Sequence, residues 1–358
     1  MKNRVTLFSI ILIVFCAITF VFSVPAFAAK QKPLILKFSD MSPSTGLRPQ
    51  FLMKAAEEVE KATEGRVKIQ FYWSNSLVHV KENVRAVQSG VADMAWVMPI
   101  YHPAAYPLGL VSQNVLSAPH SGEAGFIVRA FWDLWDECKP LRSEVEKWGS
   151  TMWYLMPYEG YGCYATKPIK TIEDFNGMRL RVSSEGIGKM VSAVGAHPQF
   201  VPASEVYTSL EKGMFDGAVV GYEWGKRYSF YEVTKYLNLL DSCMIGCAYG
   251  IVSTDKIAKM SEQDRKKFFE IGRRVSIEYG EAQQRNKQSD IKAMEEKGMV
   301  LVPFPEKEKE RWANLPELKS MIPNWLEQEE KAGRGKDARE VMEAFLRKFG
   351  IPELMPKQ

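Results

Sequence analysis

Residues 173–224 decide how this chain folds. They read EDFNGMRLRVSSEGIGKMVSAVGAHPQFVPASEVYTSLEKGMFDGAVVGYEW, with apolar residues at strand spacing in three places and at helix spacing in two. The pattern predicts a strand, helix, strand, helix and strand over residues 178–182, 187–194, 197–201, 204–212 and 214–220. Strands that alternate with helices through short loops are typical of a mainly parallel sheet covered on both faces.

The same order of elements is predicted nearer the N-terminus. There the strands cover residues 34–38, 67–73 and 91–97, and the helices cover residues 48–63 and about 80–90. Gly90-Val91-Ala92-Asp93 also resembles Gly213-Met214-Phe215-Asp216, because each run ends a helix and begins the last strand of its unit. This weak internal repeat predicts two similar α/β lobes, with a ligand site where the carboxyl ends of their strands meet.

Three further segments are expected to connect the lobes. Residues 151–164 read as an extended crossing segment rich in aromatic residues, and residues 237–252 can return the chain to the first lobe. A long helix is predicted from Ser261 to about Lys297, as a brace across both lobes. We therefore expect lobe I to contain residues 29–157 and about 246–289, and lobe II to contain residues 158–245 and about 290–358.

The N-terminus has the pattern of an export signal. Lys2 and Arg4 precede an apolar run over residues 5–24, and Pro25-Ala26-Phe27-Ala28 supplies the small residues of a cleavage site. This predicts a signal peptide over residues 1–28, cleaved after about Ala28, and a periplasmic protein. A membrane anchor is the alternative, because the run approaches the lower length for a span. The A-x-A motif favours cleavage.

Composition excludes several classes of protein. A hydrophobic content of 46% and a charged content of 25% are ordinary for a soluble globular chain. The formal net charge is +4, and it falls to +2 without the signal segment, which carries only Lys2 and Arg4. Near-neutral charge and the lack of basic runs interleaved with aromatics predict no nucleic-acid partner.

Four cysteines follow the predicted cleavage site: Cys138, Cys163, Cys243 and Cys247. An exported chain meets an oxidising compartment, so disulfides are allowed, but four thiols permit three pairings and the sequence does not choose among them. Cys243 and Cys247 are the close pair. We expect structural thiols or one disulfide, since the scattered histidines do not suggest a zinc site.

Motifs of catalysis are missing from the sequence. It contains no G-x-S-x-G, no H-E-x-x-H and no phosphate-binding loop of the G-x-x-x-x-G-K-[ST] type. We therefore expect neither an enzyme nor a cofactor. A secreted hydrolase stays open as an alternative, because a catalytic triad needs no fixed spacing.

Arg181 is the sharpest candidate for ligand binding. It alternates with Leu180 and Val182, so it shares a strand face with Arg179 and lies nearer the carboxyl end. A guanidinium offers a planar fork that binds a carboxylate through two hydrogen bonds. The alternative is an arginine that extends to solvent or pairs with an acid at the sheet edge.

Other candidates lie just past strand ends or in the crossing segment. Aromatic side chains there can close over a ligand with their polar tips, although core packing is their commoner role. The set is Trp96, Tyr101, Tyr158, Tyr161, Ser183, Val220, Tyr222, Glu223 and Trp224. Glu223 and Asp216 are acidic, but one or two acids do not form a metal site, and no metal ligand is predicted.

At these residues the chain resembles the solute-binding subunits of tripartite ATP-independent periplasmic (TRAP) transporters, of the DctP type. The matching motifs are GRVKI (65–69), GVADM (90–94), PIKTIEDFNGMRLRV (168–182), SEVY (204–207), GMFDG (213–217) and YEVTKY (231–236). Their order and spacing hold over nearly the whole chain after the signal segment.

The resemblance implies a two-lobed α/β periplasmic binding protein that closes on a ligand without catalysis. It places the family's carboxylate-binding arginine on Arg181. Many members carry another arginine near Tyr161, and some sugar-acid binders carry an asparagine near Val220, whereas this chain has neither. Both departures make the site less polar, which predicts a monocarboxylate with an apolar or aromatic body.

The expected partners follow from the same resemblance. They are a small carboxylate and the membrane permease subunits of a TRAP transporter, and we expect the binding protein itself to be a monomer. A secreted enzyme on the same frame, or a sensor that passes the ligand signal to a receptor, are the alternative functions.

Overall fold

The computed structural model describes residues 32–158, 160–201, 205–242 and 245–356. Residues Leu34–Gln358 form one compact unit. The predicted signal peptide and Cys243 of the close cysteine pair lie outside the described residues. Cys138, Cys163 and Cys247 are buried. Within the described ranges, no helix has the length and apolar character needed to cross a membrane.

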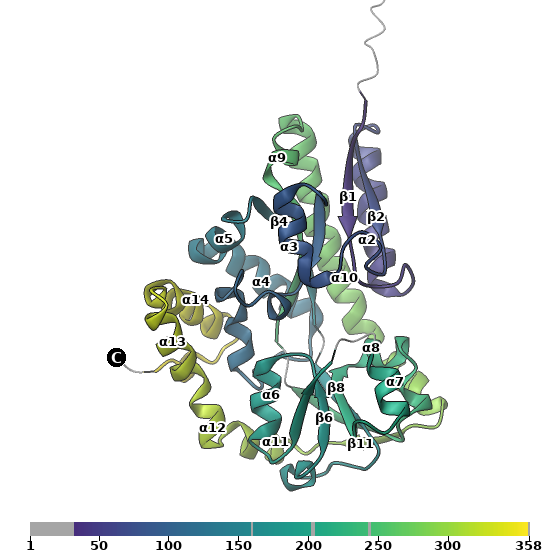
Figure 1. Cartoon of the computed structure of the whole chain (residues 1–358), viewed down its shortest axis with the longest axis vertical. Coiled ribbons are helices and arrows are strands. Elements are labelled where there is room, and N and C mark those ends of the chain that lie inside the picture. Colours follow the sequence, from purple (N-terminus) through teal and green to yellow (C-terminus); the bar gives the residue numbers. More distant parts are fainter. Residues whose placement is uncertain (1–31, 159, 202–204, 243–244, 357–358) are drawn as a thin grey trace, which may run out of the picture. The chain divides into compact units, whose positions relative to one another are not determined.

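Lobe I is built on a sheet with the strand order β2-β1-β3-β10-β4 (Figure 1). Its strands are β1 (Leu34–Ser39), β2 (Val67–Tyr72), β3 (Met94–Val97), β4 (Ser150–Pro157) and β10 (Cys247–Ser253). The helices of this part are α2 (Leu47–Ala62), α3 (Asn83–Ser89), α4 (Ala124–Glu137), α5 (Lys139–Glu146) and α9 (Thr254–Ile257). Short 3-10 turns connect them, at η1 (Val80–Glu82), η2 (Pro99–Tyr101) and η3 (Leu108–Asn114).

Lobe II is built on a second sheet with the order β11-β9-β5-β8-β6-β7. Its strands are β5 (Tyr161–Ala165), β6 (Arg179–Val182), β7 (His197–Phe200), β8 (Gly217–Gly221), β9 (Tyr236–Ser242) and β11 (Val300–Pro303). The helices are α6 (Glu185–Ser192), α7 (Val206–Glu211) and α8 (Tyr222–Arg227), with 3-10 turns η4 (Ile172–Phe175) and η6 (Phe230–Glu232). Both sheets mix parallel and antiparallel pairs, so the predicted two-lobed α/β class is confirmed.

The internal repeat is present in the structure. In lobe I, β1 lies between β2 and β3, and in lobe II, β6 lies between β7 and β8, with all four pairs parallel. Asp93 accepts a hydrogen bond from the Lys37 amide at 2.9 Å, and Asp216 accepts one from the Arg179 amide at 2.8 Å. Each aspartate therefore fixes the last strand of its unit to the first in the same way.

Two strand connections carry the chain between the sheets. β4 of the first sheet leads into β5 of the second, and β9 of the second leads back into β10 of the first. The predicted single crossing segment over residues 151–164 is thus two strands in different sheets. They are separate strands because each pairs with different neighbours, β4 with β10 and β5 with β8 and β9.

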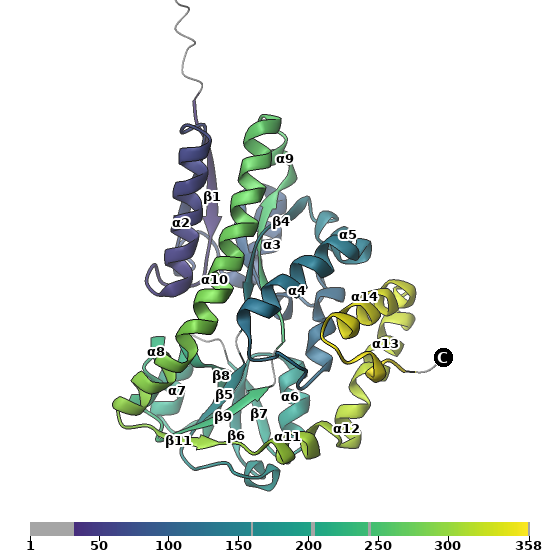
Figure 2. The same ribbon diagram turned by 180° about the vertical axis from the view of Figure 1, so that it is seen from behind.

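The long helix α10 (Glu262–Glu296) contacts both lobes (Figure 2). It packs against α2, α4 and β4 of lobe I and against α8 of lobe II. The Ser261 side chain accepts a hydrogen bond from the Asp264 amide and caps the start of the helix, as the sequence predicts. Gly272 permits a close approach to β4, because a Cβ there would lie 2.4 Å from the Trp153 carbonyl oxygen.

The C-terminal segment differs from the predicted lobe boundary. Helices α11 (Glu306–Ala313) and α12 (Pro316–Lys319) contact lobe II, at η4 and α6 respectively. Helices α13 (Met321–Lys331) and α14 (Gly335–Lys348) instead pack on η3, and α14 also packs on α4 and α5. Their apolar faces join the lobe I core, so residues 321–348 do not belong to lobe II as expected. The other boundaries stay a prediction.

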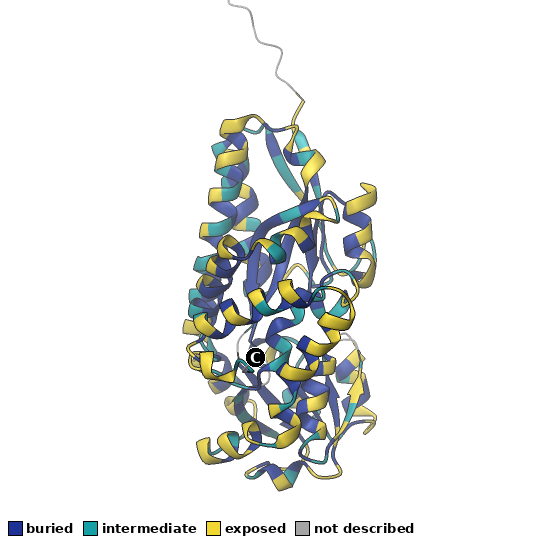
Figure 3. Ribbon diagram, turned by 90° about the vertical axis from the view of Figure 1, so that its left-hand side faces the viewer, coloured by how far each residue is buried: buried dark blue, intermediate teal, exposed yellow. Residues whose placement is uncertain are grey.

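Burial follows the layers of both lobes (Figure 3). Every residue of β3, β5, β8 and β10 is buried, because these strands have neighbours on both sides and helices on the sheet faces. The helices are buried along one side only, as α4 shows with Ile127, Phe131 and Leu134 in the core. The strand ends therefore lie at the edge of a rigid core.

Replacing Gly272 with alanine is expected to lower the free energy of unfolding. The added methyl group meets the Trp153 backbone, which cannot rotate away, and overpacking of this kind costs about 1–3 kcal/mol. Gly188→Ala in α6 is the matched control, because the one tight contact of its Cβ is with the Phe200 ring, which is 60% exposed, and its contact with Pro198 at 3.6 Å is ordinary. Alanine is favoured over glycine in a helix by about 1 kcal/mol, so this control should be neutral or stabilising. Urea unfolding followed by circular dichroism compares them; equal stability of the two variants would contradict the expectation.

Candidate ligand-binding site

Arg181 lies on β6 and is only 1% exposed. Its Nε donates a hydrogen bond to the Val201 carbonyl oxygen at 2.9 Å, and its side chain is hydrogen-bonded to Tyr101 of lobe I. Burial lowers the pKa of Arg181 because the charged form loses water, while Tyr101 and Tyr161 nearby act in the opposite direction. An arginine still keeps its proton at any relevant pH. A buried positive charge thus bridges the two lobes.

The buried Arg48 and the partly buried Arg227 differ from Arg181 in their partners. Arg48 forms an ion pair with Asp40 at 2.7 Å, and both side chains are at most 5% exposed. Arg227 binds Glu223 through Nε at 2.9 Å and also through Nη2. Among the described residues, no carboxylate forms an ion pair with Arg181. The charges of Arg48 and Arg227 are therefore balanced within the protein, whereas no carboxylate of the described residues balances that of Arg181.

The paired arginine Arg48 comes from the first turn of α2 and reaches across lobe I. It donates to Ser42 as well as to Asp40, and its guanidinium lies 5.2 Å from the Trp96 ring centroid. The Trp96 ring is in turn 6.2 Å from the Tyr101 ring. Arg48 and Arg181 are thus connected through two aromatic rings at the carboxyl end of β3.

A cavity of about 810 Å³ opens beside Tyr101, at the carboxyl ends of the strands. From lobe I it is lined by residues such as Met41, Asn75 and Tyr101. From lobe II it is lined by Val182, Ser183 and Val201, the residues that flank Arg181 in sequence or in space. It also extends to Trp325 on α13. A volume of this size accommodates a small organic ligand.

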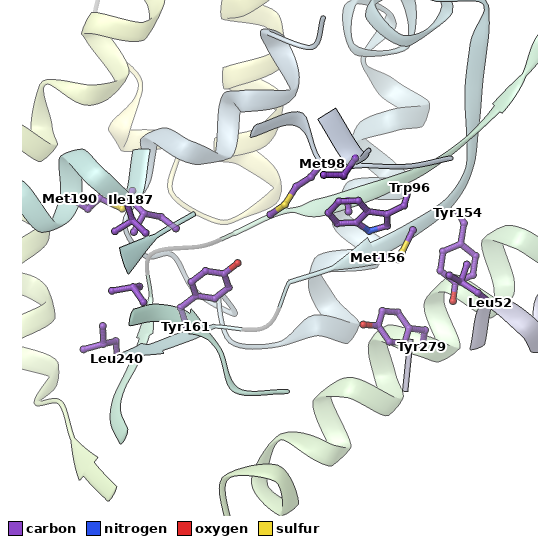
Figure 4. Close-up of a cluster of buried hydrophobic side chains, with 14 of the residues drawn as sticks. Leu52, Trp96, Met98, Tyr154, Met156, Tyr161, Ile187, Met190, Leu240 and Tyr279 are labelled. Atoms are coloured by element: carbon purple, nitrogen blue, oxygen red, sulfur yellow. The ribbon is translucent and has the colours of Figure 1, made fainter. Parts of the chain in front are cut away.

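A much smaller cavity, of about 20 Å³, lies on the other side and is lined mainly by large side chains. Trp96, Tyr161 and Tyr279 extend their polar tips toward the same region (Figure 4). The complete lining is Arg48, Trp96, Met156, Pro157, Tyr158, Tyr161, Gly221, Trp224, Ala248, Tyr279 and Gln283. Arg181 lines neither cavity, but Tyr101, which lines the large one, and Tyr161, which lines the small one, both lie close enough to act on its charge.

Six of the ten predicted site residues line these two cavities. Tyr101 and Ser183 line the large one, and Trp96, Tyr158, Tyr161 and Trp224 line the small one. Arg181 lines neither, but Tyr101 and Tyr161 lie close to it. Val220, Tyr222 and Glu223 also line neither cavity. Val220 packs in a buried cluster, the Tyr222 hydroxyl donates to Asp241 at 2.8 Å, and Glu223 binds Arg227. Val220 and Tyr222 thus serve the packing of lobe II, whereas the Glu223 carboxylate lies beside Gly46 of lobe I, where an added Cβ would be 3.5 Å from its Oε1.

Sequence reasoning missed Arg48, Asp40 and Gln283. Asp40 and Arg48 follow the carboxyl end of β1, and Arg181 was selected because it lies near the carboxyl end of β6, so the same rule could have found them. Gln283 had no such signal, because it lies in the middle of the 35-residue helix α10. Only tertiary packing brings it to the cavity.

The two acids considered beside a metal both bind arginines instead. Asp216 accepts from Arg179, and Glu223 accepts from Arg227. Throughout the described part of the chain, no three His, Cys, Asp or Glu residues gather in a way that would hold a metal ion.

An enclosed cation between two α/β lobes, surrounded by aromatic side chains from both, is the arrangement of a two-lobed solute-binding protein. The comparison with protein families agrees. The chain belongs to the DctP family, described as bacterial extracellular solute-binding protein, family 7, whose model matches residues 38–319. Members of this family are solute-binding proteins rather than enzymes, so this chain is a solute-binding protein.

Individual relatives are distant. The C4-dicarboxylate-binding periplasmic protein DctP of Rhodobacter capsulatus is 29% identical over 214 residues, which are 56% of this chain and 59% of that protein. The chain thus matches less than two thirds of the length of that relative. DctP7 of Bordetella pertussis, an extracytoplasmic solute receptor binding pyroglutamic acid, is 22% identical with a TM-score of 0.74, covering 87% of this chain and 99% of that one.

A further solved structure is a TRAP solute-binding protein from an unidentified marine microbe. It is specific for aromatic acid ligands and was crystallised with 3-hydroxybenzoate. It is 19% identical with a TM-score of 0.77, covering 88% of this chain and 99% of that one. At such identities, the likeness to solved structures establishes the fold alone.

Replacing Asp40 with asparagine is expected to destabilise the protein strongly. The change keeps the shape of the side chain but leaves Arg48 buried without its counter-charge, and breaking one partner of a buried pair costs about 3–5 kcal/mol. Arg179→Gln is the control, because its pair with Asp216 is largely exposed and should contribute less than about 1 kcal/mol. Denaturant unfolding measures both; a loss for Asp40→Asn no larger than for Arg179→Gln would rule out the balanced buried pair.

Proposed function

We propose that this protein captures a small organic monocarboxylate between its lobes and delivers it to the membrane permease of a TRAP transporter. The observation that carries the proposal is the contrast among these three arginines. Arg48 and Arg227 have carboxylate partners, while no described carboxylate pairs with Arg181. A ligand carboxylate is the missing partner of this charge.

Charge balance favours one carboxylate over two. A single carboxylate on Arg181 would leave the buried region neutral, and the guanidinium fork can bind it with two hydrogen bonds. A second carboxylate would find Arg48 and Arg227 already paired, so it would be buried without compensation. That penalty amounts to several kcal/mol. This chain therefore differs in its expected ligand from the C4-dicarboxylate-binding relative of Rhodobacter capsulatus.

The body of the ligand is expected to be apolar or aromatic. Tyr101 and Tyr161 lie near the guanidinium, Trp96 and Trp224 line the small cavity with Tyr161, and all four offer flat faces for a ring. Pyroglutamic acid and 3-hydroxybenzoate, named for the two solved neighbours, each combine one carboxylate with a ring. They are accordingly the first acids to test here.

Ligand entry requires the lobes to separate. Arg181 is 1% exposed, and its contacts come from Tyr101 in lobe I and Val201 in lobe II. The 20 Å³ cavity beside it admits little more than a water molecule. We propose that the described conformation is the closed form, which the permease recognises, and that the lobes separate when the ligand enters.

Arg181→Lys is expected to weaken carboxylate binding by about 10–100-fold, because lysine keeps the charge and loses the planar fork. Isothermal titration calorimetry with 3-hydroxybenzoate and with pyroglutamate measures the loss. Arg179→Lys is the matched control on the same strand, since Arg179 is exposed and pairs with Asp216. An unchanged affinity in Arg181→Lys would disprove the role given to this residue.

Monocarboxylates are expected to raise the melting temperature of the wild-type protein, and succinate at the same concentration is expected not to. A ligand that binds only the folded state raises the free energy of unfolding. The increase grows with the logarithm of the ligand concentration once that concentration exceeds the dissociation constant. Mass spectrometry of acids released from denatured protein gives an independent test. A released dicarboxylate, or stabilisation by succinate alone, would overturn the proposed ligand class.

A further inference from the structure

Three buried polar atoms without hydrogen-bond partners among the described residues belong to side chains that line the same small cavity. They are the Nε of Arg48, the hydroxyl of Tyr158 and the Oε1 of Gln283. Arg48 and Gln283 are only 4% and 5% exposed. A buried polar atom left unpaired costs about 1–3 kcal/mol. Three such atoms around one cavity indicate that the cavity receives a polar group of a bound molecule, which supplies the missing hydrogen bonds.

The three atoms are held by separate, well-packed elements. Arg48 belongs to the first turn of α2, Gln283 to the middle of α10, and Tyr158 to the turn after β4, where its amide donates to the Gly246 carbonyl at 2.8 Å. Asp40 fixes the Arg48 guanidinium through its Nη2, which leaves Nε–H available. The cavity is therefore preorganised rather than formed by one mobile side chain.

The chemistry of the three atoms defines the group that fits. Arg48 Nε can only donate, Gln283 Oε1 can only accept, and the Tyr158 hydroxyl can do either. A matching group must both accept and donate a hydrogen bond. Because Asp40 already balances the charge of Arg48, the group must also be neutral, since a carboxylate or an ammonium would be buried without a counter-charge. A hydroxyl or an amide meets these requirements.

We infer that this cavity is a second subsite of the ligand site, for a hydroxyl or amide on the same molecule whose carboxylate binds Arg181. The inference rests on the proposed function and narrows its ligand to monocarboxylates that carry such a group. The volume of about 20 Å³ suits one group of the size of water. The Tyr101 and Trp96 rings connect Arg181 to Arg48, so the body of the ligand lies along these rings.

Two pairs of acids test the subsite in the wild-type protein. Benzoate lacks the hydroxyl of 3-hydroxybenzoate, and cyclopentanecarboxylate lacks the lactam of pyroglutamate, while each pair keeps the carboxylate and the ring. We expect the hydrogen-bonding member of at least one pair to bind about tenfold or more tightly by calorimetry, the effect of one satisfied buried hydrogen bond. Equal affinities within both pairs would mean that only water fills the cavity, and would overturn the inference.

Two variants test whether the named atoms cause the tighter binding of the hydrogen-bonding acid in each pair. Gln283→Leu and Tyr158→Phe each remove one polar group with little change in shape. The ratio of the two affinities within a pair should therefore fall toward one, while the affinity for the unsubstituted acid stays the same or rises. Gln288→Leu, an exposed residue on the same helix, is the control and should leave the preference intact. Melting temperatures without ligand establish that each variant folds, and the two variants are independent tests.

The results separate this inference from the proposed function. If all four acids bind and Arg181→Lys weakens all of them, while neither subsite variant changes the preference, the subsite is wrong and the proposed function stands. If none of the four acids binds to the wild-type protein, the proposed function fails and the subsite fails with it.

Discussion

The burial of one guanidinium without a carboxylate partner among the described residues is the constraint on which the binding region depends. Removing Arg181 from water is unfavourable unless other groups replace the lost hydrogen bonds. The Val201 carbonyl and Tyr101 replace part of them, and they belong to different lobes. The same interactions that tolerate the charge therefore also hold the lobes together around it.

The scaffold positions this charge through strand order. β6 is enclosed between β7 and β8, so Arg181 leaves the sheet at a fixed register, beside Gln199 on one side and Ala218 on the other. Asp216 fixes β8 to β6 through the Arg179 amide, as Asp93 fixes β3 to β1 through the Lys37 amide. Because both lobes use the same arrangement, the carboxyl ends of two similar sets of strands present side chains to one region.

Arg48 and Arg227 are paired with carboxylates, and this distinguishes them from Arg181, which we propose binds the ligand. Asp40 and Glu223 hold Arg48 and Arg227 in place, and both pairs are buried enough that losing one partner would expose the other to a large desolvation penalty. Aromatic side chains occupy much of the remaining space and limit water around the site. Among the described residues, the region thus holds one positive charge without a carboxylate partner and a few neutral polar atoms, and this charge pattern underlies the ligand class that we propose.

The sequence by itself determined the local order of elements, the internal repeat, the capped long helix and the position of Arg181 near a strand end, because these depend on spacing along the chain. It also placed the aromatic residues Trp96, Tyr101, Tyr158 and Tyr161 near the site. Tertiary structure alone decided which arginines are paired, that α13 and α14 pack on lobe I, and that Gln283 reaches the cavity from α10. The physical reason is that periodicity reports which side of an element is buried, whereas the partner across the interface depends on how distant elements pack.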